Sequence, residues 1–216
     1  MINLVIIDFD DTLSMTEEAC FHIENETAQK LGFPPMTREA HLKNWGKPLE
    51  QAIVERIPGI DPTAFMQLVY KVHQQHIETG RIDIISNENL EFLDNVKSSG
   101  RKLAILTSRS LQEVKHLLRD HPINTRIEKF YHKDNSEYLK PDPRVFDKVL
   151  TDFSVAPNEA VYLGDSVGDA VSAKTAGLHF IAVLESGLRT EEDFIHIPID
   201  SFVKTLPGAF NYISTN

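Results

Sequence analysis

Asp8-Phe9-Asp10-Asp11-Thr12 directly follows a fully apolar run at residues 4–7. A short continuous apolar run is typical of a β-strand that is covered on both faces. The carboxylates that follow are so close together that they repel one another unless a cation lies between them. Alternate side chains of an extended segment point to the same side, so Asp8 and Asp10 are predicted to face one site.

Similar apolar runs recur along the chain and alternate with helix-like segments. The further predicted strands are residues 103–106, 127–131, 160–163 and 180–183. The predicted helices between and after them are residues 90–99, 111–118, 142–150 and 166–176. Strands that alternate with helices predict an α/β fold, a doubly wound and mostly parallel sheet of the Rossmann-like kind.

One long segment interrupts this alternation after the first strand. Residues 14–82 contain no convincing strand, and four amphipathic segments predict helices at 17–31, 38–44, 49–56 and 62–79. A connection of this length exceeds ordinary loops, so we expect residues 14–82 to form an inserted α-helical cap domain. The catalytic core then comprises residues 1–13 and 83–216. A continuous α/β domain with long loops is the alternative.

Polar residues stand where the predicted strands end. Thr107-Ser108-Arg109 follows one strand, and Gly164-Asp165-Ser166-Val167-Gly168-Asp169 follows another. Lys140 stands in the loop before a predicted helix. Ligands of open α/β sheets bind beyond the carboxyl ends of the strands, so these residues are predicted to meet at one edge.

Each of these residues has a simpler explanation when it is taken alone. Asp and Thr commonly cap helices at such turns, and Asp142 is most simply an N-cap. Asp8 and Asp10 are harder to explain as caps. Together with Asp165 and Asp169 they predict a cluster of carboxylates, and ligation by oxygen alone favours Mg²⁺.

The joint pattern resembles the haloacid dehalogenase (HAD) superfamily. Its four motifs are matched in order by Asp8 to Thr12, Thr107, Lys140, and Gly164 to Asp169. The resemblance covers residues 1–13 and 83–190. The helical insert resembles the C1-type caps of members similar to phosphoglycolate phosphatase and β-phosphoglucomutase, a looser likeness.

The resemblance implies a Mg²⁺-dependent phosphatase that hydrolyses a small phosphomonoester metabolite. Asp8 is the implied nucleophile, which forms an aspartyl-phosphate, and Asp10 is the implied general acid and base. Thr107 and Lys140 are the implied holders of the phosphoryl oxygens. The implied Mg²⁺ ligands are Asp8, the backbone carbonyl of Asp10, Asp165 and Asp169, the last as ligand or neighbour.

Substrate contacts outside these motifs are predicted more loosely. Ser108 is a candidate because it adjoins Thr107. Lys47 lies in Asn44-Trp45-Gly46-Lys47-Pro48 of the insert, where a cation beside a glycine can approach an anion; a plain turn between helices is the alternative. Arg109 either reaches substrate or has a surface role.

Other functions on the same scaffold have discriminating features. A phosphomutase shares the core and differs in the cap and in the lifetime of the aspartyl-phosphate. Dehalogenases need no acid at the position of Asp10, and phosphonate-cleaving relatives use a lysine of the cap as a Schiff base. Phosphorylated signalling modules lack a long helical insert, and a non-catalytic binding protein is expected to have lost key site positions.

The composition narrows the partners and the compartment. The 216 residues include 22 basic and 32 acidic side chains, a formal net charge of −10, which argues against nucleic acid as a partner. The single Cys20 excludes a disulfide framework and fits a reducing compartment. No apolar run spans a membrane, and the N-terminus lacks a signal-peptide pattern. We therefore expect a cytoplasmic protein, monomeric or weakly homodimeric.

Overall fold

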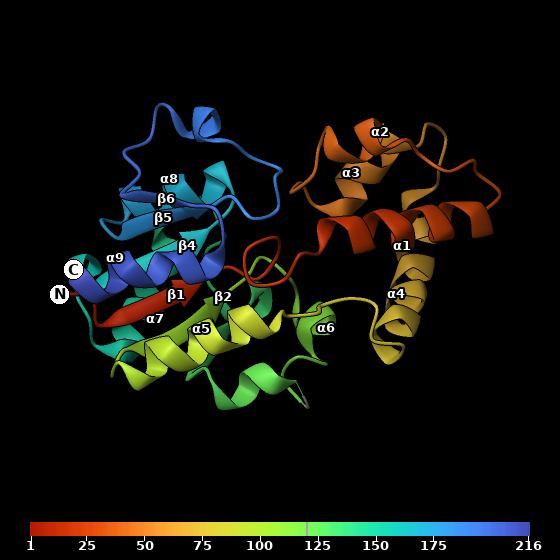
Figure 1. The fold of residues 1–216 in the computed structure, drawn as a ribbon. Coiled ribbons are helices and arrows are strands. Elements are labelled where there is room, and N and C mark those ends of the chain that lie inside the picture. Colours follow the sequence, from red (N-terminus) through yellow and green to blue (C-terminus); the bar gives the residue numbers. More distant parts are fainter. Residues whose placement is uncertain (120) are drawn as a thin grey trace. The chain divides into compact units, whose positions relative to one another are not determined.

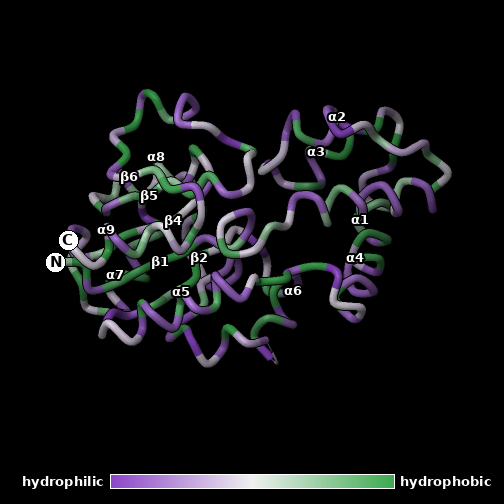
Figure 2. Tube along the Cα trace, in the orientation of Figure 1, coloured by the Kyte–Doolittle hydropathy of each residue, from purple (hydrophilic) through white to green (hydrophobic). Residues whose placement is uncertain are grey.

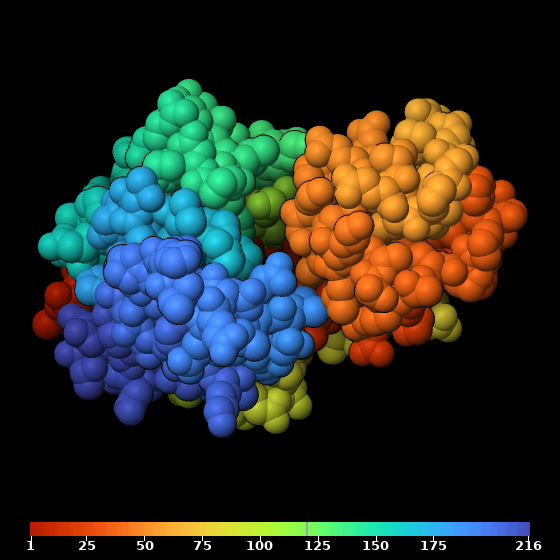
Figure 3. Space-filling model, turned by 90° about the horizontal axis from the view of Figure 1, so that it is seen from above, coloured from red at the N-terminus to blue at the C-terminus, as the bar shows by residue number. Residues whose placement is uncertain are grey.

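The computed structural model describes residues 1–119 and 121–216, which divide into two units. One unit joins Met1–Ser14 to Ile85–Asn216, and the other is Met15–Ile84. In the space-filling view the visible atoms of the second unit are coloured orange to yellow (Figure 3). Each unit has its own set of buried apolar residues, so each is described by itself.

The first unit is built on a parallel sheet with the strand order β3-β2-β1-β4-β5-β6 (Figure 1). The strands are β1 (Leu4–Ile7), β2 (Lys102–Leu106), β3 (Lys129–Tyr131), β4 (Ala160–Gly164), β5 (His179–Val183) and β6 (Ser201–Val203). Its α-helices are α5 (Asn87–Ser98), α6 (Leu111–Val114), α7 (Asp147–Phe153), α8 (Val167–Thr175) and α9 (Phe210–Thr215). Short 3₁₀ helices are η1 (Pro122–Thr125), η2 (Lys133–Asn135), η3 (Pro143–Phe146), η4 (Pro157–Glu159), η5 (Glu191–Phe194) and η6 (Leu206–Ala209).

Both faces of this sheet are buried, as the continuous apolar strands predict. Val5 and Ile7 of β1 pack on the side of α5, whereas Leu4 and Ile6 pack on the side of α7 and α8. In Figure 2 the trace of β1 is green, the colour of hydrophobic residues, because all four of its residues are apolar. The predicted doubly wound α/β sheet is confirmed.

Some elements differ from their predictions. Helix α6 ends at Val114 instead of residue 118; Val114 and Leu117 are buried, whereas Leu111 and Leu118 are exposed. The predicted helix at 142–150 is instead a 3₁₀ turn, η3, followed by α7; Asp142 is its N-cap and accepts from the Arg144 backbone N–H at 3.0 Å. Strand β6 and helix α9 lie in residues 195–216, where no element was predicted.

The second unit is helical. It contains α1 (Glu17–Lys30), α2 (Arg38–Leu42), α3 (Leu49–Arg56) and α4 (Pro62–Glu78). Helices α1 and α4 pack together around apolar residues that include Ile23, Phe65 and Val69. This arrangement agrees with the amphipathic pattern of the segment.

A buried polar network links three helices of this unit. Arg56 Nη1 lies 2.5 Å and His41 Nδ1 lies 3.2 Å from the same oxygen of Glu24, Oε2. Arg56 Nε donates to Asn44 Oδ1 at 2.6 Å, and His41 Nε2 lies 3.0 Å from Glu17 Oε1. Charges this deeply buried persist only when they are paired, so the network fixes the segment around Asn44.

None of the helices among the described residues has the length and apolar character that a bilayer span requires.

Candidate active site

The site lies at the carboxyl ends of the three central strands of the sheet. Asp8 follows β1, Thr107 follows β2, and Asp165 follows β4. In the ladder Ile7 pairs with Ile105 on one side and with Leu163 on the other. The Asp8 backbone N–H extends this ladder by donating to the Leu163 carbonyl at 2.9 Å. The parallel register therefore brings these strand ends together.

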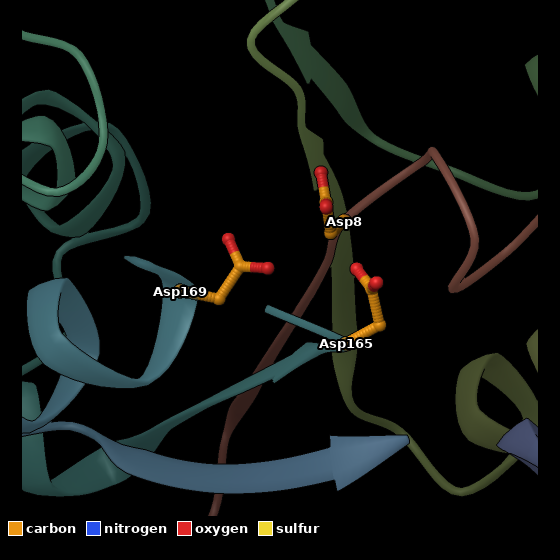
Figure 4. A group of neighbouring side chains, drawn as sticks. All are labelled: Asp8, Asp165 and Asp169. Atoms are coloured by element: carbon orange, nitrogen blue, oxygen red, sulfur yellow. The ribbon is translucent and has the colours of Figure 1, made fainter. Parts of the chain in front are cut away.

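Three buried carboxylates converge at this edge. Asp8, Asp165 and Asp169 each offer an oxygen, and these oxygens lie within 4.8 Å of one another. Figure 4 shows the three side chains directed toward a common point, Asp169 from α8 and the other two from strand ends. All three residues are at most 8% exposed, so water screens their charges poorly.

Lys140 is the cation of this cluster. Its Nζ lies 2.8 Å from Asp8 Oδ1 and 2.7 Å from Asp169 Oδ1. It also donates to the Tyr162 hydroxyl at 2.9 Å. These three contacts fix the Lys140 ammonium beside Asp8.

Asp169 is held by hydrogen bonds to both of its oxygens. Oδ2 accepts from the Ser166 backbone N–H at 3.1 Å and from its hydroxyl at 2.7 Å, a capping box at the start of α8. Oδ1 faces Lys140 and the Tyr162 hydroxyl, the latter at 3.1 Å. A Cβ on Gly164 would lie 2.8 Å from Asp169, so only glycine fits there without displacing this carboxylate.

The cluster carries more negative charge than Lys140 neutralises. Burial raises the pKa of Asp8 from 3.8 to about 7, against the opposing effect of Lys140, with Asp169 and Asp10 adding to the rise. Burial likewise raises the pKa of Asp165 well above its ordinary value, and repulsion from Asp169 and Asp8 raises it further. Burial acts to lower the pKa of Lys140, but Asp169 and Asp8 hold it well above its ordinary range.

These features match what a divalent cation requires. Three carboxylates facing one ammonium leave an excess of two negative charges when all are ionised. Carboxylate oxygens are hard ligands of the kind that divalent magnesium prefers. Asp8 and Asp165 are better placed as direct ligands than Asp169, because both oxygens of Asp169 already accept hydrogen bonds within the protein.

Asp10 and Thr12 lie on a tight turn just after Asp8. The Leu13 and Ser14 backbone N–H groups both donate to the Phe9 carbonyl, at 3.1 and 3.0 Å. The side chain of Thr12 is buried and its Oγ1 donates to Asp165 Oδ1 at 3.4 Å. The Asp10 carboxylate lies against the Arg109 guanidinium, where Nε is 3.0 Å from Oδ2.

The strand-end geometry agrees with a known family. The family model described as haloacid dehalogenase-like hydrolase matches residues 5–183. The chain belongs to this family. The resemblance inferred from the four sequence motifs is thereby confirmed. As a haloacid dehalogenase-like hydrolase, the chain carries its acidic motifs at the ends of β1 and β4, within the matched range.

Two curated relatives of this haloacid dehalogenase-like hydrolase are phosphatases by name. A phosphorylated carbohydrates phosphatase of Thermotoga maritima is 27% identical over 179 residues, which cover 82% of each chain. A phosphoglycolate phosphatase of Nitrosospira multiformis is 24% identical and covers 98% of this chain and 96% of that protein. A solved structure, CbbY of Rhodobacter sphaeroides in complex with phosphate, has a TM-score of 0.76 at 24% identity, with coverage of 97% and 96%. At that identity the likeness shows the fold.

Asp10, predicted to join the cluster, is not one of its three carboxylates and pairs with Arg109 instead. The other sequence-predicted residues of this haloacid dehalogenase-like hydrolase fall into three groups. Asp8, Lys140, Asp165 and Asp169 form the buried cluster. Thr107 is buried at the end of β2, and Ser108 beside it is exposed. Lys47 belongs to the helical unit, where its Nζ lies 3.4 Å from Glu55 Oε1. The chemical roles of these residues remain predictions.

Two residues of the site were not foreseen in their observed contacts. Tyr162 stands within the apolar run that predicts a strand at residues 160–163, and its buried hydroxyl contacts Lys140 and Asp169. A phenol within an otherwise apolar buried strand is the signal that points to a polar partner. Arg109 was weighed between a substrate contact and a surface role; its side chain is 10% exposed and pairs with Asp10.

Proposed function

We propose that this chain is a Mg²⁺-dependent phosphatase that hydrolyses a small phosphomonoester through an aspartyl-phosphate on Asp8. The observation that carries the proposal is the buried cluster of Asp8, Asp165 and Asp169 with Lys140 at the carboxyl edge of the sheet. The names of the curated relatives, a phosphorylated carbohydrates phosphatase and a phosphoglycolate phosphatase, support this substrate class.

Asp8 acts as the nucleophile in this proposal. Its carboxylate attacks phosphorus, which splits one difficult displacement into two easier ones. The Lys140 ammonium, 2.8 Å from Asp8 Oδ1, orients the attacking carboxylate and opposes the rise that burial causes in its pKa. Asp10 protonates the leaving oxygen and then takes a proton from the attacking water, help worth about 10²- to 10⁴-fold in rate.

The remaining residues hold the cation and the phosphoryl group. Asp8, Asp165 and the backbone carbonyl of Asp10 would hold Mg²⁺, with Asp169 close by. When bound, Mg²⁺ offsets the repulsion between the anionic nucleophile and the anionic phosphoryl group. The Thr107 hydroxyl and Lys140 hold the phosphoryl oxygens as charge develops on them. The helical unit acts as the cap that selects the substrate, with Lys47 and Ser108 as substrate contacts.

The test is a panel of phosphorylated metabolites, with phosphoglycolate and hexose phosphates first, assayed for phosphate release with and without Mg²⁺. We expect Mg²⁺-dependent release that Asp8→Asn abolishes. Asp94→Asn is the matched control, because Asp94 is half-exposed and pairs with Arg126 on the surface. Full turnover by the Asp8→Asn variant would refute the assignment of Asp8 as the nucleophile. Isomerisation of a hexose phosphate without phosphate release would indicate a mutase instead.

A further inference from the structure

An ion pair joins Asp10, two residues after Asp8 of the carboxylate cluster, to Arg109. Arg109 Nε donates to Asp10 Oδ1 at 3.1 Å and to Oδ2 at 3.0 Å, and Nη2 donates to Oδ1. Both carboxylate oxygens therefore accept from one guanidinium. Two donors of one planar guanidinium that engage both oxygens fix the orientation of the Asp10 carboxylate.

Arg109 is itself held from several sides. Its backbone N–H donates to Thr107 Oγ1 at 3.2 Å, and its carbonyl accepts from the Lys133 backbone N–H at 2.8 Å. Its guanidinium lies 5.0 Å from the ring centroid of Phe9, the residue between Asp8 and Asp10. A planar, delocalised cation that stacks and binds a carboxylate with two donors is fixed more rigidly than a lysine ammonium.

We propose that Arg109 is a positioning residue that holds Asp10 as the proton-accepting carboxylate for hydrolysis of the phosphoenzyme. This inference rests on the proposed function and deepens it. In that step the oxygen of water bonds to phosphorus and the bond from phosphorus to Asp8 breaks. The proton of the water passes to Asp10, which leaves inorganic phosphate and the free carboxylate of Asp8.

The two half-reactions depend differently on this ion pair. Formation of the phosphoenzyme from p-nitrophenyl phosphate needs no proton from Asp10, because nitrophenolate leaves as a stable anion. Breakdown of the phosphoenzyme needs Asp10 as a base. Loss of Arg109 is therefore expected to slow breakdown far more than formation with this substrate. A purely structural role of Arg109 would slow both steps together.

The experiment measures the two rate constants separately with Mg²⁺ present. The burst of nitrophenolate in stopped flow gives formation. The decay of acid-quenched phosphoenzyme, followed by intact mass after the substrate is exhausted, gives breakdown. The variants are Arg109→Ala and Arg109→Lys. The matched control is Arg126→Ala, which removes another ion pair of an arginine and an aspartate, one that makes no contact with the carboxylate cluster.

For Arg109→Ala we expect breakdown to slow by about 10- to 100-fold, a part of what a general base contributes. Arg109→Lys keeps the charge without the two-donor geometry and should lie between Arg109→Ala and the unsubstituted protein. If Arg109→Ala does not fold, Arg109→Lys alone must show slower breakdown. Equal slowing of both steps, or unchanged breakdown, would overturn the inference. If the unsubstituted protein forms no phosphoenzyme, the proposed function itself fails.

Discussion

The charge excess at the carboxylate cluster predicts how the metal-free protein responds to pH. Burial raises the pKa of Asp8 from 3.8 to about 7. Between these values the folded protein holds a proton that the unfolded chain has released. The folded state then binds more protons, so its stability falls as the pH rises through this window. The raised pKa of Asp165 acts in the same direction.

The magnitude follows from the width of the window. Each pKa unit corresponds to about 1.4 kcal/mol, so raising the pH from about 5 to about 7 costs at most about 3 kcal/mol for Asp8. Asp8→Asn removes the titrating group but also removes one partner of Lys140. We therefore expect the stability of Asp8→Asn, relative to the unsubstituted protein, to rise by about 1–3 kcal/mol between about pH 5 and about pH 8.

The assay is urea unfolding with EDTA at both pH values, with Asp94→Asn as the control that should show no such trend. Addition of Mg²⁺ at the higher pH should raise the stability of the unsubstituted protein and leave Asp8→Asn nearly unchanged. A difference between Asp8→Asn and the unsubstituted protein that is independent of pH would refute the assignment of the excess charge to Asp8.

Three further substitutions test other contacts. Gly164→Ala places a Cβ 2.8 Å from the buried Asp169 side chain, so this variant should lose activity and about 1–3 kcal/mol of stability. In Gly168→Ala the nearest atom to the new Cβ is 3.7 Å away, so this variant should retain its activity and its stability. Thermal melting curves and kcat measurements compare the two variants. Tyr162→Phe removes the hydroxyl 2.9 Å from Lys140, which should lower kcat by about tenfold at unchanged fold, as circular dichroism and steady-state rates will reveal. Arg56→Ala leaves a buried carboxylate of the helical unit without its guanidinium and should destabilise the protein by about 3–5 kcal/mol in urea unfolding; a loss below about 1 kcal/mol would contradict the buried network.

The parts of the fold that the sequence predicts are those with a strong local pattern. The apolar run at residues 4–7 and the capped start of α8 at Ser166 define their elements without tertiary information. Helix α6 shows the limit of this approach, because the apolar residues of the predicted helix at 111–118 do not reveal that the helix ends at Val114 or that Leu111 and Leu118 are exposed. Strand β6 is short and only partly buried, so it lacks a local signal.

The candidate site likewise contains residues that the sequence predicts and contacts that only the tertiary structure shows. Asp8 and Asp165 are predictable because each follows a predicted strand and the carboxyl ends of parallel strands meet at one edge of the sheet. The pairing of Asp10 with Arg109 joins residues 99 positions apart, and no local pattern specifies a contact of this kind. The contact of Tyr162 with Lys140 depends in the same way on the packing of a loop against β4.

The most direct test of the central claim is to locate the phosphate on the protein. The enzyme is mixed with substrate and Mg²⁺, quenched in acid, digested and mapped by mass spectrometry. The account predicts a phosphorylated peptide that carries the modification on Asp8 and that disappears in Asp8→Asn. Turnover of substrate with the phosphate on another residue, or with Asp8 never modified, would contradict it.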